Sequence, residues 1–384
     1  MRVFRALAPV AAAALLALAA AELVVRLAFP QLAVLPPPGQ KPNRFSPDDV
    51  LGYRLDRSAH WVQNGDRGEF AVDYWTTPAG FRTSAPGAPV CAGHELLCVG
   101  NSFVEGWGLA FEKSFLKVAQ VALGQAGKPW CLANYGMSGY SACQSWLLVR
   151  DLLREKARPV VFFVTPGTAF DDAEFLRGAN VDAHGLATGV DVMRLGAPRP
   201  GPPPPTALAL AERLRPTLES LALFRMVLRT LRNRYEVERI VPGDPTTDRF
   251  FLTRAGVDYH KPLEDTMRHV AAMQAACAQA RVPFLAVLVP YGHQVAGYEW
   301  TEGRLRQRLE PGRVYPAGGL AEIGVRLAAA GVPVLDLLPV LRAASKPERH
   351  LYFTLDIHLN EAGNAVVAAE LARWLAARPE LAAN

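Results

Sequence analysis

Short apolar runs alternate with helical stretches along most of this 384-residue chain. The runs are short and almost free of polar residues, as buried strands are, and they cover residues 96–99, 130–134, 159–165, 282–290 and 332–338. Stretches with the length and apolar spacing of helices lie between or after them, at residues 111–124, 145–156, 263–280, 320–330 and 361–378. Strands separated by helices favour a parallel sheet that is covered on both faces. The sequence therefore predicts an α/β fold.

Composition narrows the possible partners. Half of the residues are hydrophobic, which is enough to bury a full core. The net charge of +5 is mildly basic, but the Lys and Arg residues are dispersed and form no basic patch interleaved with aromatic residues. Nucleic acid is therefore not an expected partner. The five cysteines show no metal-ligand spacing, and Cys98, Cys131 and Cys277 lie in apolar runs that favour buried thiols. The sequence predicts no metal and no organic cofactor.

The amino terminus predicts a membrane segment. An uncharged run, Ala6–Ala21, follows Arg2 and Arg5, and a helix continuing to Phe29 would be about 36 Å long, enough to cross a bilayer. The basic start predicts a single-pass helix in the inner membrane, with the rest of the chain on the periplasmic side. A cleaved signal peptide is the alternative, because Ala19–Ala21 offers small residues for processing.

The expected organisation has four parts. Residues 1–30 form the anchor or signal segment, and residues 31–50 form a proline-rich tether. The α/β domain is expected to comprise residues 51–175 and 251–384. Between these two parts, residues 176–250 interrupt the alternation of strands and helices with a proline run and helical patterns. We interpret this segment as an insertion.

A serine near the start of the α/β region is a candidate nucleophile. The apolar run Leu96–Val99 ends at Gly100, and Ser102 follows two residues later. A turn at the end of a parallel strand presents its side chains at the carboxyl edge of the sheet, where such folds bind ligands. Near the other end of the chain, Asp356 and His358 precede a helix. A serine, a histidine and an aspartate together are the parts of a hydrolytic triad.

Three ordered blocks resemble those of the SGNH (GDSL-type) hydrolase superfamily, in particular its membrane-tethered bacterial branch. They are Gly100-Asn101-Ser102-Phe103-Val104-Glu105-Gly106, Asn134-Tyr135-Gly136-Met137-Ser138-Gly139-Tyr140, and Asp356-Ile357-His358-Leu359-Asn360-Glu361-Ala362-Gly363. The order and spacing agree with the family over residues 50–175 and 255–380, which is most of the chain.

The resemblance implies both a fold and a set of roles. The fold would be a flavodoxin-like three-layer α/β/α sandwich with a central parallel sheet and a helical insertion. Ser102 would be the nucleophile, His358 would take its proton, and Asp356 would orient the imidazole. The oxyanion hole would comprise the backbone N–H groups of Ser102 and Gly139 and one side chain of a third block.

The third block departs from the family pattern. An asparagine is expected after the third strand, and this sequence has Thr168 there. A threonine hydroxyl can donate one hydrogen bond, but it is shorter than the amide it replaces. Loss of one oxyanion donor costs roughly 3 kcal/mol, or 10²–10³ in rate. Thr168 is the expected third donor, and the alternatives are a slowed enzyme or a fold without turnover.

The sequence thus predicts a serine esterase that hydrolyses an acyl or acetyl ester on a cell-envelope glycan or lipid. One alternative is an O-acyltransferase, in which the hydroxyl of an envelope polysaccharide replaces water as the acceptor. Another alternative is a catalytically weak binding or assembly protein of the same fold, suggested by Thr168.

Overall fold

The chain forms two compact units in its computed structural model, one comprising residues 1–42 and 199–241 and the other residues 43–198 and 242–384. The structure describes residues 2–28, 44–88, 91, 94–191, 206–218, 220–238, 260–307 and 309–381. The second unit carries the sheet and all the candidate site residues.

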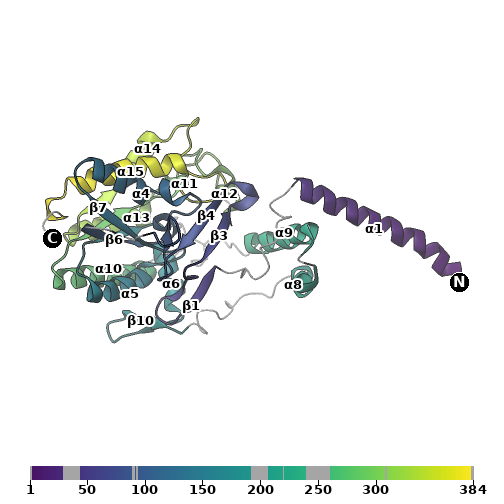
Figure 1. Cartoon of the computed structure of the whole chain (residues 1–384), viewed down its shortest axis with the longest axis horizontal. Helices are drawn as coiled ribbons and strands as arrows, with labels where there is room; N and C mark the ends of the chain where they lie inside the picture. The colour runs from purple at the N-terminus through teal and green to yellow at the C-terminus, as the bar shows by residue number, and fades with distance from the viewer. Residues whose placement is uncertain are drawn as a thin grey trace. The chain divides into compact units, whose positions relative to one another are not determined.

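A five-stranded parallel sheet lies at the centre of this second unit (Figure 1). Its order is β12 (Val334–Asp336), β11 (Phe284–Leu288), β8 (Val160–Val164), β6 (His94–Gly100) and β7 (Trp130–Gly136). The pairing is parallel throughout, with Cys98 opposite Asn134 and Val161. Every strand coincides with a run predicted from the sequence, because continuous apolar residues can be buried on both faces of a parallel sheet. The expected α/β class is confirmed.

Helices cover both faces of the sheet. Side chains alternate along β6, so Leu97 and Val99 join one hydrophobic core while Leu96 and Cys98 join the other. The first core is shared with α5 (Ala142–Glu155), α6 (Thr168–Leu176), α10 (His260–Gln279) and α13 (Gly318–Ala329). The second core is shared with α4 (Phe115–Gln125), α14 (Leu338–Ala344) and α15 (Glu361–Ala376). Figure 1 shows α4 and α15 on the side of β6 and β7 opposite to α5 and α10. The expected three-layer sandwich is thereby confirmed.

Antiparallel strands lie outside the central sheet, most of them before it in the sequence. A hairpin pairs β1 (Phe45–Asp48) with β2 (Gly52–Leu55), and a second small sheet has the order β3 (His60–Asn64), β4 (Ala71–Thr76) and β5 (Arg82–Thr83). A further hairpin pairs β9 (Ala179–Val181) with β10 (Ala187–Val190). The short helices are α3 (Ser102–Glu105), α11 (Gly292–Val295), α12 (Thr301–Arg306), η1 (Asp66–Gly68), η2 (Phe111–Lys113) and η3 (Pro379–Leu381).

Three helices make up the described part of the other unit: α1 (Arg2–Ala28), α8 (Thr206–Leu218) and α9 (Ala222–Glu238). Glu22 forms an ion pair with Arg26, one turn further along α1, at 2.7 Å. The same carboxylate accepts hydrogen bonds from the backbone N–H groups of Ala222 and Leu223, at 2.9 and 2.8 Å. Glu22 thus satisfies donors that the first turn of α9 would otherwise leave unpaired.

The described residues contain no helix with both the length and the apolar character that crossing a membrane requires. The expected transmembrane signal-anchor and the single-pass inner-membrane localisation are therefore wrong. The physical reason lies in the charges of α1. Its uncharged run, Ala6–Ala21, has 16 residues, about 24 Å of helix against a hydrocarbon core of about 30 Å. The next turns carry Glu22 and Arg26, which are bonded to each other.

One disulfide joins Cys91 to Cys131, with the two Cα atoms 5.6 Å apart. The expectation that Cys131 is a buried free thiol is therefore wrong, because spacing along the chain does not show which cysteines meet in space. Cys98 and Cys277 are free and buried, as predicted.

Candidate active site

The candidate nucleophile, Ser102, lies where β6 turns into α3. The strand ends at Gly100, and Ser102 is the first residue of the short helix. Asn101 caps this helix, since its side-chain oxygen accepts a hydrogen bond from the N–H of Phe103 at 3.1 Å. Its amide nitrogen donates to the hydroxyl of Thr165 at 2.9 Å. An ionised aspartate could make the first bond, but it could contact the Thr165 hydroxyl only as an acceptor, because it has no donor.

The structure brings Ser102, His358 and Asp356 together although 256 residues separate the serine from the histidine. The Ser102 hydroxyl oxygen is 2.5 Å from Nε2 of His358. Nδ1 of the same ring is hydrogen-bonded to a carboxylate oxygen of Asp356. Each ring nitrogen therefore has one partner, which is the arrangement in which a histidine accepts a proton from serine while a carboxylate fixes its orientation.

Asp356 is held ionised by its surroundings. Burial opposes ionisation, but the adjacent His358 and the hydrogen bonds donated by His358 and Trp107 outweigh it and lower the pKa of Asp356 below its usual value. The indole N–H of Trp107 lies 3.0 Å from the second carboxylate oxygen. Both oxygens of Asp356 are thus occupied, and its charge faces the imidazole.

This lowered pKa predicts how stability depends on pH. An ionised Asp356 stabilises the folded state at every pH above the unfolded-state value of about 3.9, and this contribution is lost as the pH falls through the lower folded-state pKa. We expect wild type to exceed Asp356→Asn in free energy of unfolding at pH 6, and the difference to shrink towards pH 3. Urea titrations of both proteins across this range measure it. A difference that is constant or grows on acidification would contradict the prediction.

A carboxylate from the amino-terminal strands holds the backbone before Asp356. Glu69 lies between β3 and β4, and its Oε1 accepts hydrogen bonds from the backbone N–H groups of Thr354 and Leu355, the latter at 2.9 Å. Its Oε2 accepts from the N–H of Asp356 itself, also at 2.9 Å. Sequence reasoning missed Glu69, because no motif links it to a loop 287 residues away.

Aromatic side chains pack around the histidine. The ring centroids of Phe103 and Trp107 lie 4.6 and 5.8 Å from that of His358. The guanidinium of Arg44 lies 4.1 Å from the centroid of Trp107. Burial lowers the pKa of Arg44, and the negative charge of Glu105 opposes that effect. An open pocket of about 570 Å³ is lined by Arg44, Phe45, Tyr53, Ser102, Trp107, Ser138, Gly139, Asp356, Ile357 and His358.

Of the predicted oxyanion residues, Gly139 lies in the pocket and Thr168 lies outside it. Gly139 lines the same pocket as Ser102. Thr168 does not, because it is almost completely buried and its hydroxyl accepts a hydrogen bond from the N–H of Thr165 at 3.1 Å. The structure therefore brings Ser102 and Gly139 to one pocket and leaves Thr168 inside the start of α6. An oxyanion role for each of them stays a prediction.

Part of the chain is similar to a known protein family. Residues 247–384 match the family described as SGNH hydrolase-like domain, acetyltransferase AlgX. This segment includes Asp356 and His358, whereas Ser102, which contacts His358, lies outside it. This segment is thus similar to SGNH hydrolase-like domains. No match was found among the curated proteins.

The solved structures similar to this chain include lipolytic proteins and esterases. A member of the lipolytic protein G-D-S-L family from Veillonella parvula is 10% identical, with 74% of this chain and 100% of that chain covered and a TM-score of 0.37. An acetyl xylan esterase, AlAXEase, is 13% identical, with 74% and 100% covered and a TM-score of 0.37. The psychrotrophic esterase EstA from Pseudoalteromonas sp. is 11% identical, with 74% and 100% covered and a TM-score of 0.35. Likenesses this distant carry no argument about activity.

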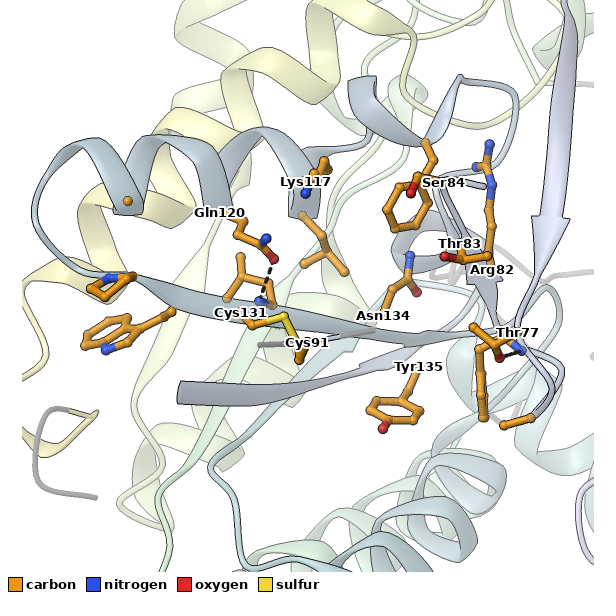
Figure 2. Close-up of a pocket in the computed structure, with 18 of the residues that line it drawn as sticks. Thr77, Arg82, Thr83, Ser84, Cys91, Lys117, Gln120, Cys131, Asn134 and Tyr135 are labelled. Atoms are coloured by element: carbon orange, nitrogen blue, oxygen red, sulfur yellow. Dashed lines mark hydrogen bonds between the residues drawn. A yellow bond between two sulfur atoms is a disulfide. The ribbon is translucent and has the colours of Figure 1, made fainter. Parts of the chain in front are cut away.

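The unit that carries the sheet has a second cavity, of about 580 Å³, beside the edge strand β7 and the Cys91–Cys131 disulfide (Figure 2). Gln120 reaches the strand there and accepts a hydrogen bond from the N–H of Leu132 at 3.0 Å. None of the triad residues lines this cavity. Within the described part of the chain, no three His, Cys, Asp or Glu side chains are grouped so that they could hold a metal ion.

Proposed function

We propose that the domain is a serine esterase that cleaves an acyl or acetyl ester through a covalent acyl-enzyme. The observation that carries the proposal is the 2.5 Å contact between the Ser102 hydroxyl and His358, whose ring is also bonded to Asp356. A serine hydroxyl is a weak nucleophile on its own and needs such a base within hydrogen-bond reach.

The proposed reaction has two steps. The Ser102 oxygen attacks the ester carbonyl while its proton passes to Nε2 of His358, and the backbone N–H groups of Ser102 and Gly139 stabilise the oxyanion. The carbon–oxygen bond to the leaving alcohol then breaks, and His358 returns the proton to that alcohol. Water, deprotonated by His358, attacks the acyl-serine, and the acid is released with Ser102 restored.

A second candidate function is acetyl transfer to a hydroxyl group of a glycan. The match to a family described by an acetyltransferase favours it. The pocket supports it as well, since an open space of about 570 Å³ beside Ser102 leaves room for an acceptor larger than water. The acyl-enzyme is the same, and only the group that attacks it differs.

Covalent labelling tests the nucleophile. We expect a fluorophosphonate probe to label the wild-type protein stoichiometrically, with the adduct located on Ser102 by mass spectrometry. Ser102→Ala should abolish labelling, while Ser114→Ala, which changes a buried serine whose hydroxyl donates to the carbonyl of Phe111, serves as the matched control. If wild type is not labelled at Ser102, both enzymatic candidates fail, and a binding protein of the same fold is favoured.

The acceptor is tested separately. With p-nitrophenyl acetate as donor, hydrolysis predicts that acetate is the product whether or not a glycan is present. Transfer predicts that release of p-nitrophenol rises with glycan concentration and that the glycan gains one acetyl group for each p-nitrophenol. Mass spectrometry of the glycan distinguishes the two outcomes.

A further inference from the structure

A tight turn presents Gly139 to the catalytic pocket. The N–H of Tyr140 donates to the carbonyl of Met137 at 3.0 Å, which closes a four-residue turn over Ser138 and Gly139. Gly139 has a φ of +79°, as the third residue of a type II turn does, and this conformation favours glycine. The peptide unit at the middle of this turn comprises the carbonyl of Ser138 and the N–H of Gly139.

Tyr53 holds that middle peptide by its carbonyl. Its hydroxyl donates to the carbonyl oxygen of Ser138 at 2.7 Å. Burial raises the pKa of Tyr53 far above the physiological range, so the hydroxyl keeps its proton and stays a donor. The peptide is trans, and in a planar trans peptide the C=O and N–H bonds point in opposite directions. Fixing the carbonyl of Ser138 on Tyr53 therefore also fixes the direction of the Gly139 N–H.

Glu105 holds the other side of the turn. Its Oε2 accepts hydrogen bonds from the N–H of Ser138 at 2.6 Å and from the hydroxyl of Ser138 at 2.7 Å. The Glu105 side chain is fully buried, so these bonds are not exchanged for water. They also occupy the N–H of Ser138, which leaves the next N–H along the chain, that of Gly139, for the pocket.

The nucleophile and this turn are part of one rigid assembly. Glu105 is the last residue of α3, and Ser102 is the first. Gly136, where β7 ends, lies so close to α3 that an added Cβ would be 2.3 Å from the backbone nitrogen of Glu105. Any displacement of the turn relative to Ser102 would therefore have to break the Glu105 contacts or separate β7 from α3.

We infer that Tyr53 and Glu105 are positioning residues that clamp the Ser138–Gly139 peptide, so that the Gly139 N–H faces the oxyanion formed on Ser102. Both act through the peptide and neither touches the reacting atoms. This inference rests on the proposed acyl-enzyme function. It adds to that function the side chains that set one oxyanion donor, and one of them comes from the amino-terminal hairpin rather than from the α/β core.

The test measures steady-state hydrolysis of p-nitrophenyl acetate. Tyr53→Phe removes only the hydroxyl, and Glu105→Gln keeps one acceptor oxygen but removes the charge. Since the bound ester carries no oxyanion and the charge develops only on the way to the tetrahedral intermediate, we expect each variant to lower kcat roughly tenfold, with KM changed less than threefold. The double variant should lose less than the product of the two single effects, because both act on one peptide. The matched control is Tyr135→Phe, which removes a tyrosine hydroxyl that bonds to Lys156 and lies away from this pocket.

One control and two separate outcomes make the result interpretable. Thermal melting of each variant excludes unfolding as the cause of a lower kcat. If Tyr53→Phe and Glu105→Gln keep kcat within twofold of wild type, or if the double variant shows independent effects, the inference is overturned while the proposed function stands. If wild type lacks Ser102-dependent labelling, the proposed function itself fails. That outcome can be told apart from failure of the inference, because the labelling experiment uses no variant of Tyr53 or Glu105.

Discussion

Replacing His358 by alanine is expected to lower kcat/KM for p-nitrophenyl acetate by about 10⁵- to 10⁶-fold. The Ser102 hydroxyl lies 2.5 Å from Nε2 of His358, which is the base able to take its proton. Without this base, attack on the carbonyl would have to proceed from an un-ionised hydroxyl. Steady-state kinetics at pH 7.5, with the initial rate corrected for uncatalysed hydrolysis, measure the loss.

Two comparisons show whether this loss comes from the triad. Because Ser102 and His358 act as a unit, the double variant with Ser102→Ala should be no slower than either single variant. His184→Ala, a change at an exposed loop histidine, is the matched control and should leave kcat/KM within twofold of wild type. Retention of more than a tenth of wild-type activity by His358→Ala would rule out His358 as the base.

Removal of the Glu69 carboxylate is expected to cause the second large loss in kcat/KM. Glu69→Ala should lower kcat/KM about 10²-fold, because a displacement of about 1 Å in a catalytic group is enough for a loss of that size. The carboxylate accepts hydrogen bonds from three consecutive backbone N–H groups, and the last of them belongs to Asp356. Loss of the carboxylate leaves these donors without their partner and lets Asp356 shift away from His358.

Graded variants test this mechanism for Glu69. Glu69→Gln keeps the length and one acceptor oxygen, so its loss should be smaller than that of Glu69→Ala. Asp73→Asn, a change at an exposed carboxylate of the neighbouring β4 that pairs with His60, is the control and should leave kcat/KM unchanged. Fluorophosphonate labelling should slow in the same order as kcat/KM. Equal activity of Glu69→Ala and wild type would contradict a role for Glu69 in holding the loop.

The α/β fold could be predicted because its signals are local. Each strand of the sheet contains a continuous apolar run and is followed by a helix, so the pattern along the chain already indicates a layered α/β fold. Ser102 could be found for a related reason. The end of a parallel strand places the following residues at a functional edge, and the sequence shows where β6 ends.

The supporting side chains could not be predicted in this way. Glu69 and Tyr53 lie in antiparallel strands or turns that precede the sheet, and their partners are backbone groups far along the chain. Backbone N–H and C=O groups are the same at nearly every residue, so the sequence carries no mark of which of them needs a partner. Thr168 shows the opposite case. The family pattern predicts an oxyanion role from its position, and only the structure shows that its hydroxyl is buried and accepts a hydrogen bond from the N–H of Thr165, just before α6.

The sequence by itself determined the order of the strands and helices, the three blocks and the residue types of the triad. Periodicity and short motifs are properties of neighbouring residues, so they can be read before folding. The tertiary structure alone decided that Ser102 meets His358 and Asp356, and that Tyr53 and Glu105 enclose the Ser138–Gly139 peptide. These are contacts between distant parts of the chain, and only the packing of the folded protein brings such groups within hydrogen-bond distance.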